Sequence, residues 1–308
     1  MKSRYITLTV FLFATLFSVK AQQDAQYTQY MYNTMVFNPA YAGSRGVLSI
    51  ESLYRTQWVG LEGAPDTGTI SFNTPVGDSE RLGIGVSIIN DEIGPSQETY
   101  FDASFSYTIP VSNYGKLAFG IKGGLSWLNV DFNKLSAFEA NDQYLQPNVD
   151  NVFSPNVGVG VYYHTPNFYL GLSAPNLIET NHFDASPNVS YVAKERINYY
   201  LMSGYVFDLG ENTKFKPATL IKAVQGAPLQ LDVSANFLFS EKLMLGAAWR
   251  WDAALSAMAG FQVSEMIMIG YAYDADTTNL GNFNSGSHEI FLRFEIFSRG
   301  RMLSPRFF

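Results

Sequence analysis

Cysteine and histidine, which recur in nucleophilic and zinc sites, are absent or few in this 308-residue sequence. There is no cysteine, which excludes disulfides, thiolate catalysis and cysteine-ligated zinc. The three histidines, His164, His182 and His288, lie in separate segments and lack the close spacing of metal ligands. A serine hydrolase built around His288 is the enzymatic alternative that stays open, although no GxSxG motif accompanies it. We therefore expect a protein that is not an enzyme and that uses no metal or cofactor.

Charged side chains recur inside otherwise apolar segments, where a single buried charge is costly. Their positions favour a lattice of ion pairs in the interior of the fold, which would stabilise the structure or hold a segment threaded into it. The residues expected in this lattice are Glu51, Arg55, Asp102, Lys122, Arg196, Asp232, Arg250, Glu289, Arg293 and Glu295.

The elements that carry these charges are segments in which apolar and polar residues alternate. In "HEIFLRFEIF", Glu289, Arg293 and Glu295 share one face, while Ile290 and Leu292 share the other. Alternation with a period of two predicts β-strands with unlike faces. About fourteen such segments follow one another between residues 46 and 297, each near the length that a tilted membrane strand requires. The pattern predicts an all-β fold, a transmembrane antiparallel β-barrel of about 14 strands.

A soluble β-sandwich is the alternative architecture, because it also alternates. Its outward faces would have to be rich in charge, yet charged residues make up only 15% of the chain and aromatic residues another 15%. In a barrel, the apolar faces would contact lipid and the polar faces would line the interior. The composition favours the barrel.

The connections between the segments alternate between short turns and mostly longer loops, among them residues 90–97, 131–151 and 176–193. Outer-membrane barrels have short periplasmic turns and longer extracellular loops. We expect the outer membrane of a Gram-negative bacterium, with the long loops outside. An even number of strands would place both termini in the periplasm.

The two ends of the chain read differently from the barrel. Residues 1–21 have the basic start, apolar run and small residues of a cleaved signal peptide. Residues 22–45 are rich in Tyr and Asn, and they follow neither the period of a helix nor that of a strand. This favours an irregular strap or plug over a disordered tail. Residues 298–308 form a basic and aromatic tail, expected in the periplasm. The net charge of −7 and a pI near 5.0 argue against nucleic acid as a partner.

Motifs at both ends of the mature chain resemble the PorP/SprF family of outer-membrane proteins, which belong to the type IX secretion and gliding-motility machinery of Bacteroidetes. The amino-terminal motif "DAQYTQYMYNTMVFNPAYAGSRG" matches the family at Gln29, Tyr30, Asn38, Pro39, Ala40, Ala42 and Gly43. The carboxy-terminal motif, in "GSHEIFLRFEIF" and "PRFF", matches it at Ser287, His288, Glu289, Ile290, Pro305, Arg306 and Phe307.

This resemblance implies a non-enzymatic outer-membrane component of type IX secretion. The implied role is that of an accessory or surface anchor for exported adhesins or other cargo that bears a carboxy-terminal sorting domain. The implied partners are outer-membrane lipid, that cargo, a periplasmic peptidoglycan-binding lipoprotein and other secretion components. The alternative is a diffusion channel or a hydrophobic-solute transporter, because a barrel of this width can hold an open lumen.

Overall fold

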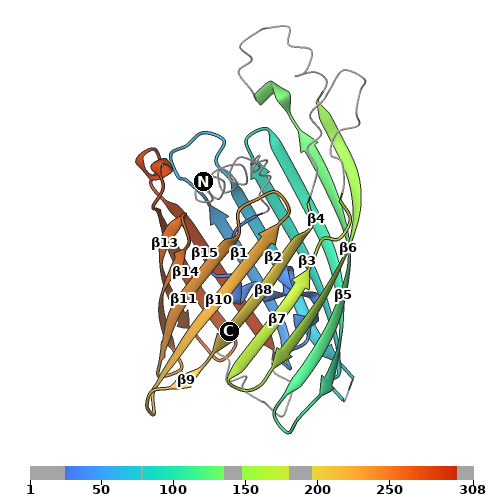
Figure 1. Cartoon of the computed structure of the whole chain (residues 1–308), viewed down its shortest axis with the longest axis vertical. Coiled ribbons are helices and arrows are strands. Elements are labelled where there is room, and N and C mark those ends of the chain that lie inside the picture. The colour runs from blue at the N-terminus through green and yellow to red at the C-terminus, as the bar shows by residue number, and fades with distance from the viewer. Residues whose placement is uncertain (1–24, 78, 135–147, 180–195, 297–308) are drawn as a thin grey trace, which may run out of the picture.

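Antiparallel pairing of neighbouring strands closes the chain into an all-β barrel (Figure 1). The computed structural model describes residues 25–77, 79–134, 148–179 and 196–296. The predicted signal peptide and carboxy-terminal tail lie outside the described residues. The strands are β1 (Leu48–Thr56), β2 (Asp66–Val76), β3 (Leu82–Ile93), β4 (Ser96–Pro110), β5 (Lys116–Val130), β6 (Val149–His164), β7 (Phe168–Ala174), β8 (Asn198–Tyr205), β9 (Phe207–Asp208), β10 (Thr213–Val224), β11 (Gln230–Phe239), β12 (Leu243–Arg250), β13 (Ala254–Gln262), β14 (Ile267–Asp276) and β15 (Ser287–Ile296).

Fourteen strands form the wall, because β8 and β9 both pair with β10 and are separated only by Val206. The ring closes where β1 pairs with β15, in a register that runs from Leu48 opposite Ile296 to Thr56 opposite His288. The predicted antiparallel barrel of about 14 strands is confirmed.

Residue alternation along each strand separates an apolar outer face from an inner face that carries most of the polar groups. In β11, Ser234 and Asn236 are buried inside, whereas Val233 and Phe237 point outward and are 42% and 37% exposed. Large apolar side chains are exposed around the wall in this way on nearly every strand. Such a surface suits contact with lipid and would be unfavourable in water.

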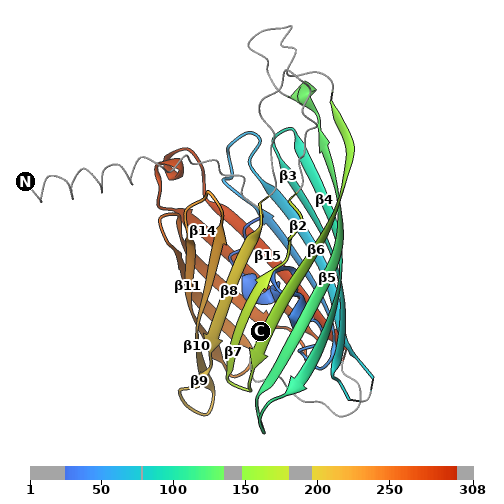
Figure 2. The same ribbon diagram turned by 45° about the vertical axis from the view of Figure 1, so that its right-hand side comes forward.

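The wall is not of even height. β4, β5 and β6 have 15, 15 and 16 residues, whereas β7 and β8 have 7 and 8. β5 and β6 rise above the rest of the rim in both views (Figures 1 and 2). The expectation of a longer loop over residues 90–97 is wrong, since β3 and β4 continue to a two-residue turn at Gly94 and Pro95. Cross-strand pairing extends the hairpin here, and the Thr99 hydroxyl donates to Asn90 Oδ1 at 3.0 Å.

Short helices lie within the barrel, between the first described residue and β1. They are η1 (Tyr30–Tyr32), α2 (Thr34–Phe37) and η2 (Pro39–Tyr41), and nearly all of their residues are buried. Figure 2 shows this amino-terminal part inside the ring of strands. Two further 3₁₀ helices, η3 (Phe132–Lys134) and η5 (Asn279–Asn282), lie in loops.

Among the described residues, the helices are all too short or too polar to cross a membrane.

Candidate functional site

The amino-terminal residues 25–46, which we call the lumen segment, run through the barrel from one end to the other. Gln26 Nε2 contacts Gln230 Oε1 at 3.5 Å, at the end of the barrel that carries the long loops. At the other end, which carries the short turns, Arg45 forms an ion pair with Glu295, one residue before β15 ends. The even number of strands therefore does not bring the two described ends of the chain to one side, because the lumen segment makes an additional crossing.

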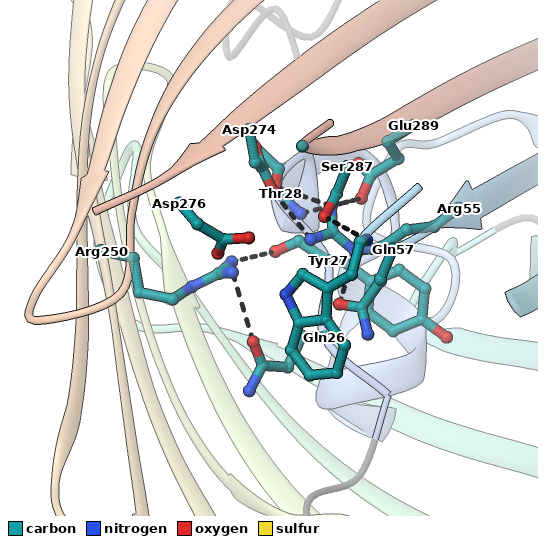
Figure 3. A network of polar contacts seen from close by, with 12 residues as sticks. Gln26, Tyr27, Thr28, Arg55, Gln57, Arg250, Asp274, Asp276, Ser287 and Glu289 are labelled. Carbon is teal, nitrogen blue, oxygen red and sulfur yellow. Dashed lines mark hydrogen bonds and ion pairs between the residues drawn. The ribbon is translucent and has the colours of Figure 1, made fainter. Parts of the chain in front are cut away.

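A buried carboxylate binds the lumen segment near the long-loop end (Figure 3). Glu289 accepts hydrogen bonds from the backbone N–H of Thr28 at 2.9 Å and of Gln29 at 2.7 Å. Arg55 pairs with Glu289 at 3.2 Å and with Asp274 at 2.7 Å. The Thr28 hydroxyl donates to the same Asp274 oxygen at 2.6 Å. Charges from β1, β14 and β15 thus bind one another and the segment together, which satisfies groups that would be costly to bury singly.

Arg250 makes a second set of contacts to the start of the segment. Its Nε donates to Asp232 Oδ1 at 2.6 Å, and both the Arg250 guanidinium and the Asp232 carboxylate are buried. Its Nη1 donates to the Gln26 side chain at 3.2 Å, and its Nη2 donates to the backbone carbonyl of Tyr27 at 3.3 Å. Together with Glu289, this arginine binds both backbone donors and backbone acceptors of the segment.

Aromatic and methionine side chains fill the middle of the lumen. The ring of Tyr32 stacks on Phe291 with the centroids 3.9 Å apart, and Phe37 meets Tyr200 edge to face at 5.1 Å. Met202 and Met268 from the wall join the same buried cluster. A water-filled lumen would favour polar side chains on the inner face. Where the lumen segment packs, the inner face is instead apolar.

Glycines in the wall allow the segment to approach the strands closely near the short-turn end. A Cβ on Gly120 would lie 2.2 Å from the backbone nitrogen of Ala40, and a Cβ on Gly160 would lie 2.0 Å from Asn38 Oδ1. Both distances are below any real Cβ contact. Glycine serves here because the neighbouring backbone occupies the space of a side chain.

The "NPAYAG" stretch has a local reason for its turn. Asn38 is extended, and its side-chain oxygen accepts the N–H of Ala40 at 3.0 Å, which caps η2 with Pro39 at its first position. The Asn38 amide donates to the carbonyl of Val161 on β6 at 3.0 Å. Gly43 follows with a φ of 70°, a conformation that favours glycine.

Most of the predicted charge lattice lies on the inner face, in several groups. Asp102 pairs with Lys122 at 2.8 Å. Arg293 lies 3.8 Å from Glu295, and Glu51 is buried near them and accepts from the Ser49 hydroxyl at 3.2 Å. The remaining members on the inner face are those described above: Arg55, Glu289, Asp232 and Arg250.

Arg196 is the exception, and the expectation that it belongs to the lumen lattice is corrected. It lies just before β8 with its side chain 43% exposed, 3.7 Å from Glu179 of the preceding loop. Sequence reasoning also missed Asp274 and Arg45, which bind Arg55 and Glu295. Asp274 shares the inner parity of Met268 and Ala272, so the alternation of β14 contained the signal for it.

The residues of the two family motifs occupy two places in the barrel. Those of the amino-terminal motif belong to the lumen segment, and Gln29, Tyr30, Asn38, Pro39, Ala40 and Ala42 are all buried. Of the carboxy-terminal motif, Ser287, His288, Glu289 and Ile290 begin β15. Pro305, Arg306 and Phe307 lie outside the described residues. Glu289 joins the two motifs, because it binds the backbone of Gln29.

The histidines do not come together. His288 lies on the outer parity of β15, where its Nδ1 is 2.6 Å from the Tyr271 hydroxyl. His164 ends β6 and is buried beside Tyr162, and His182 lies outside the described residues. The described part of the chain holds no group of three His, Asp or Glu side chains that could bind a metal ion.

A cavity of about 550 Å³ opens at the long-loop end, beside the start of the lumen segment. We call it the mouth cavity. Its lining includes Gln26 of the segment, the charged inner-face residues around it and side chains of four loops. Trp58 and Trp251 belong to two of these loops.

Solved structures similar to this chain are membrane barrels. The monoaromatic hydrocarbon channel CymD is 13% identical with a TM-score of 0.50, and the similarity covers 87% of this chain and 93% of that one. The toluene transporter TodX of P. putida is 8% identical with a TM-score of 0.45, covering 89% and 95%. The outer membrane protein Omp33 of Acinetobacter baumannii is 9% identical with a TM-score of 0.46, covering 82% and 100%. At these identities, the likeness concerns the fold.

A family model described as type IX secretion system membrane protein PorP/SprF matches residues 19–294. No curated protein matches the sequence significantly.

Proposed function

The chain belongs to the PorP/SprF family of type IX secretion system membrane proteins, and from this premise we propose that it is an accessory or surface anchor for exported proteins. It is an outer-membrane component of that system, and its family and fold are those of secretion or channel membrane proteins and not of a known enzyme family. In the proposed role it binds cargo that bears a carboxy-terminal sorting domain at the long-loop end. The short-turn end meets a periplasmic peptidoglycan-binding lipoprotein and other secretion components.

The observation that supports binding over transport is the filled lumen. Residues 27–42 are almost entirely buried, and they contact β1, β5, β6, β8, β14 and β15. A solute that crossed the barrel would have to displace a segment held by buried ion pairs, stacked rings and close backbone contacts. A barrel closed in this way offers its two ends as rigid binding surfaces.

In the proposed orientation, the long loops face the cell exterior and the short turns face the periplasm. The end of β15 at Ile296 then faces the periplasm, and Gln26 faces the exterior. The tall hairpin of β5 and β6 stands at the rim that would meet cargo (Figure 2).

Affinity purification tests this role. The chain is tagged within the short turn at residues 209–212, solubilised from outer membranes in detergent and purified, and the chains that come with it are identified. We expect an exported protein with a carboxy-terminal sorting domain, together with periplasmic secretion components. An unrelated outer-membrane barrel with the same tag is the control. Purification of the chain free of such partners from cells that export cargo would contradict the role and favour the channel alternative.

A further inference from the structure

The mouth cavity already binds one stretch of peptide, namely the start of the lumen segment. Residues 25–27 have no regular structure, and the barrel binds this stretch through its backbone as well as through the Gln26 side chain. The cavity lies directly beside Gln26 and is open at the long-loop end. A volume of about 550 Å³ is within the range of sites that bind small ligands or a few residues of a peptide.

The two arginines that line the cavity are fully engaged with protein acceptors. Arg55 donates from Nε to Gln57, from Nη1 to Thr28 and Glu289, and from Nη2 to Asp274. All three nitrogens of Arg250 donate to Asp232 or to the lumen segment. Neither guanidinium is disposed to bind an anionic ligand, because each nitrogen has an acceptor and each cation has a carboxylate partner.

The carboxylates on the same lining are less fully engaged. Asp276 accepts a hydrogen bond from the neutral amide of Asn284 at 2.9 Å. Asp252 is exposed in the tight link between β12 and β13. Within the described parts of the chain, neither Asp252 nor Asp276 forms an ion pair. The lysine of the lining, Lys222, is buried with its Nζ 5.8 Å from the ring centroid of Tyr200.

The charges of the cavity lining and of the carboxylates bound to it are negative in sum. Arg55 pairs with both Glu289 and Asp274, and Arg250 pairs with Asp232. With Lys222 there are three cations, against five carboxylates once Asp252 and Asp276 of the lining are included. The long-range field at this rim favours a positively charged group.

Two indole rings complete the lining. Trp251 is 55% exposed, and Trp58 is held in a loop where its backbone N–H donates to the Ser287 hydroxyl at 3.2 Å. Tryptophan is the side chain whose ring face attracts cations most strongly. Exposed tryptophan beside unpaired carboxylates suits a guanidinium or ammonium group on an apolar stem.

We propose that the mouth cavity is a docking site for an extended segment of the exported partner, which places an arginine or lysine side chain against Trp58 and Trp251 with its cation facing Asp252 and Asp276. The partner's backbone runs beside the start of the lumen segment. This inference rests on the proposed role in binding exported proteins, because it names the chemistry by which the long-loop end recognises them.

Calorimetric titration of the full-length protein in detergent tests the site with defined probes. The probes are the blocked pentapeptides Ac-Gly-Ser-Arg-Ser-Gly-amide and Ac-Gly-Ser-Gln-Ser-Gly-amide, with maltotriose as an uncharged saccharide. We expect the arginine peptide to bind and the glutamine peptide not to bind. Binding should weaken as salt is raised, because exposed charges are screened.

Variants locate the binding. In the double variant Asp252→Asn/Asp276→Asn, the affinity for the arginine peptide should fall by about tenfold or more. The variant loses two negative charges that attract the guanidinium at a partly exposed site. Trp251→Ala should weaken binding as well. Asp208→Asn is the matched control, because it removes an exposed carboxylate at the short-turn end, and it should leave the affinity unchanged.

Three results would overturn the inference: equal binding of the two peptides, an affinity that the double variant leaves unchanged, or binding of maltotriose in place of the peptide. Co-purification separates this inference from the proposed function. Undiminished capture of exported protein by the double variant and by Trp251→Ala would reject the docking site and leave the anchor role standing. Peptide binding without any captured exported protein in the wild type would reject the anchor role and support the chemistry of the cavity.

Discussion

Glu289 on the last strand binds the backbone of Gln29 in the lumen segment: the Gln29 N–H donates to Glu289 Oε1 at 2.7 Å. The neighbouring N–H of Thr28 donates to the other carboxylate oxygen at 2.9 Å. This carboxylate therefore connects the amino-terminal segment to the strand that closes the barrel. The two residues are 260 positions apart in the sequence.

Replacing Glu289 with glutamine should loosen the lumen segment. The amide keeps one acceptor oxygen, but it loses the charge that offsets Arg55, and breaking a buried pair of this kind costs on the order of 3 kcal/mol. We expect faster hydrogen exchange at the amides of Thr28 and Gln29 and a lower Tm in detergent. Glu241→Gln, at an exposed short turn, is the control and should change neither. Unchanged exchange at Thr28 would contradict the conclusion that Glu289 holds the lumen segment in place.

Gly120 and Gly123 form a matched pair on β5. A Cβ at Gly120 would collide with the backbone of Ala40, whereas a Cβ at Gly123 meets nothing within 4 Å. Gly120→Ala should therefore destabilise the folded barrel by about 1–3 kcal/mol, as overpacking does, and Gly123→Ala should be nearly neutral. Thermal unfolding of the two variants side by side measures the difference. Equal Tm values would mean that the segment does not press on this part of the wall.

The outward face of each strand could be predicted from the sequence because alternation is a local property. On β15, Glu289, Arg293 and Glu295 are buried inside, and Ile290 and Leu292 are exposed outside, as their spacing predicts. Because one face of each strand contacts an apolar medium and the other does not, the polarity of a residue indicates the face on which it lies.

The path of the lumen segment could not be predicted in the same way. Met202 and Met268 face inward by the alternation of their strands, but nothing in that alternation specifies the lumen segment as the partner on which they pack. The alternation of β14 places Asp274 on the inner face, but its role could not be predicted. That role depends on Arg55 and Thr28, which are distant in sequence and meet only when the ring closes.

Surface labelling should reveal the additional crossing made by the lumen segment. The sequence has no cysteine, so single cysteines introduced by Gln26→Cys and Glu80→Cys report without background. With the long loops outside, a membrane-impermeant maleimide added to intact cells should label the Gln26→Cys variant. The Glu80→Cys variant, at a short turn, should react only after the outer membrane is permeabilised. The reverse labelling pattern would show that the barrel has the opposite orientation in the membrane.

The base of the loop after β5 should loosen in acid. Hydrogen bonds from the side chain and backbone of Asn133 hold the pKa of Asp131 below its ordinary value of 3.8, with help from Asn148. Because the pKa is lowered in the folded state, this stabilisation is present above about pH 4 and is lost as the pH falls through the lowered value. Amide exchange at Asn133, corrected for intrinsic rates, should show protection that disappears with acid. In Asp131→Ala the protection should be absent at every pH, and equal protection of Asn133 in the wild type and in this variant above pH 4 would contradict the contact.

The closed lumen is the central claim, and conductance of the purified full-length protein in planar lipid bilayers tests it most directly. The packing of residues 27–42 predicts a silent wild-type protein, with openings that appear in Glu289→Gln, where the segment is less firmly bound. A large, steady current through the wild-type barrel would contradict the account, because ions would then cross where the lumen segment fills the interior.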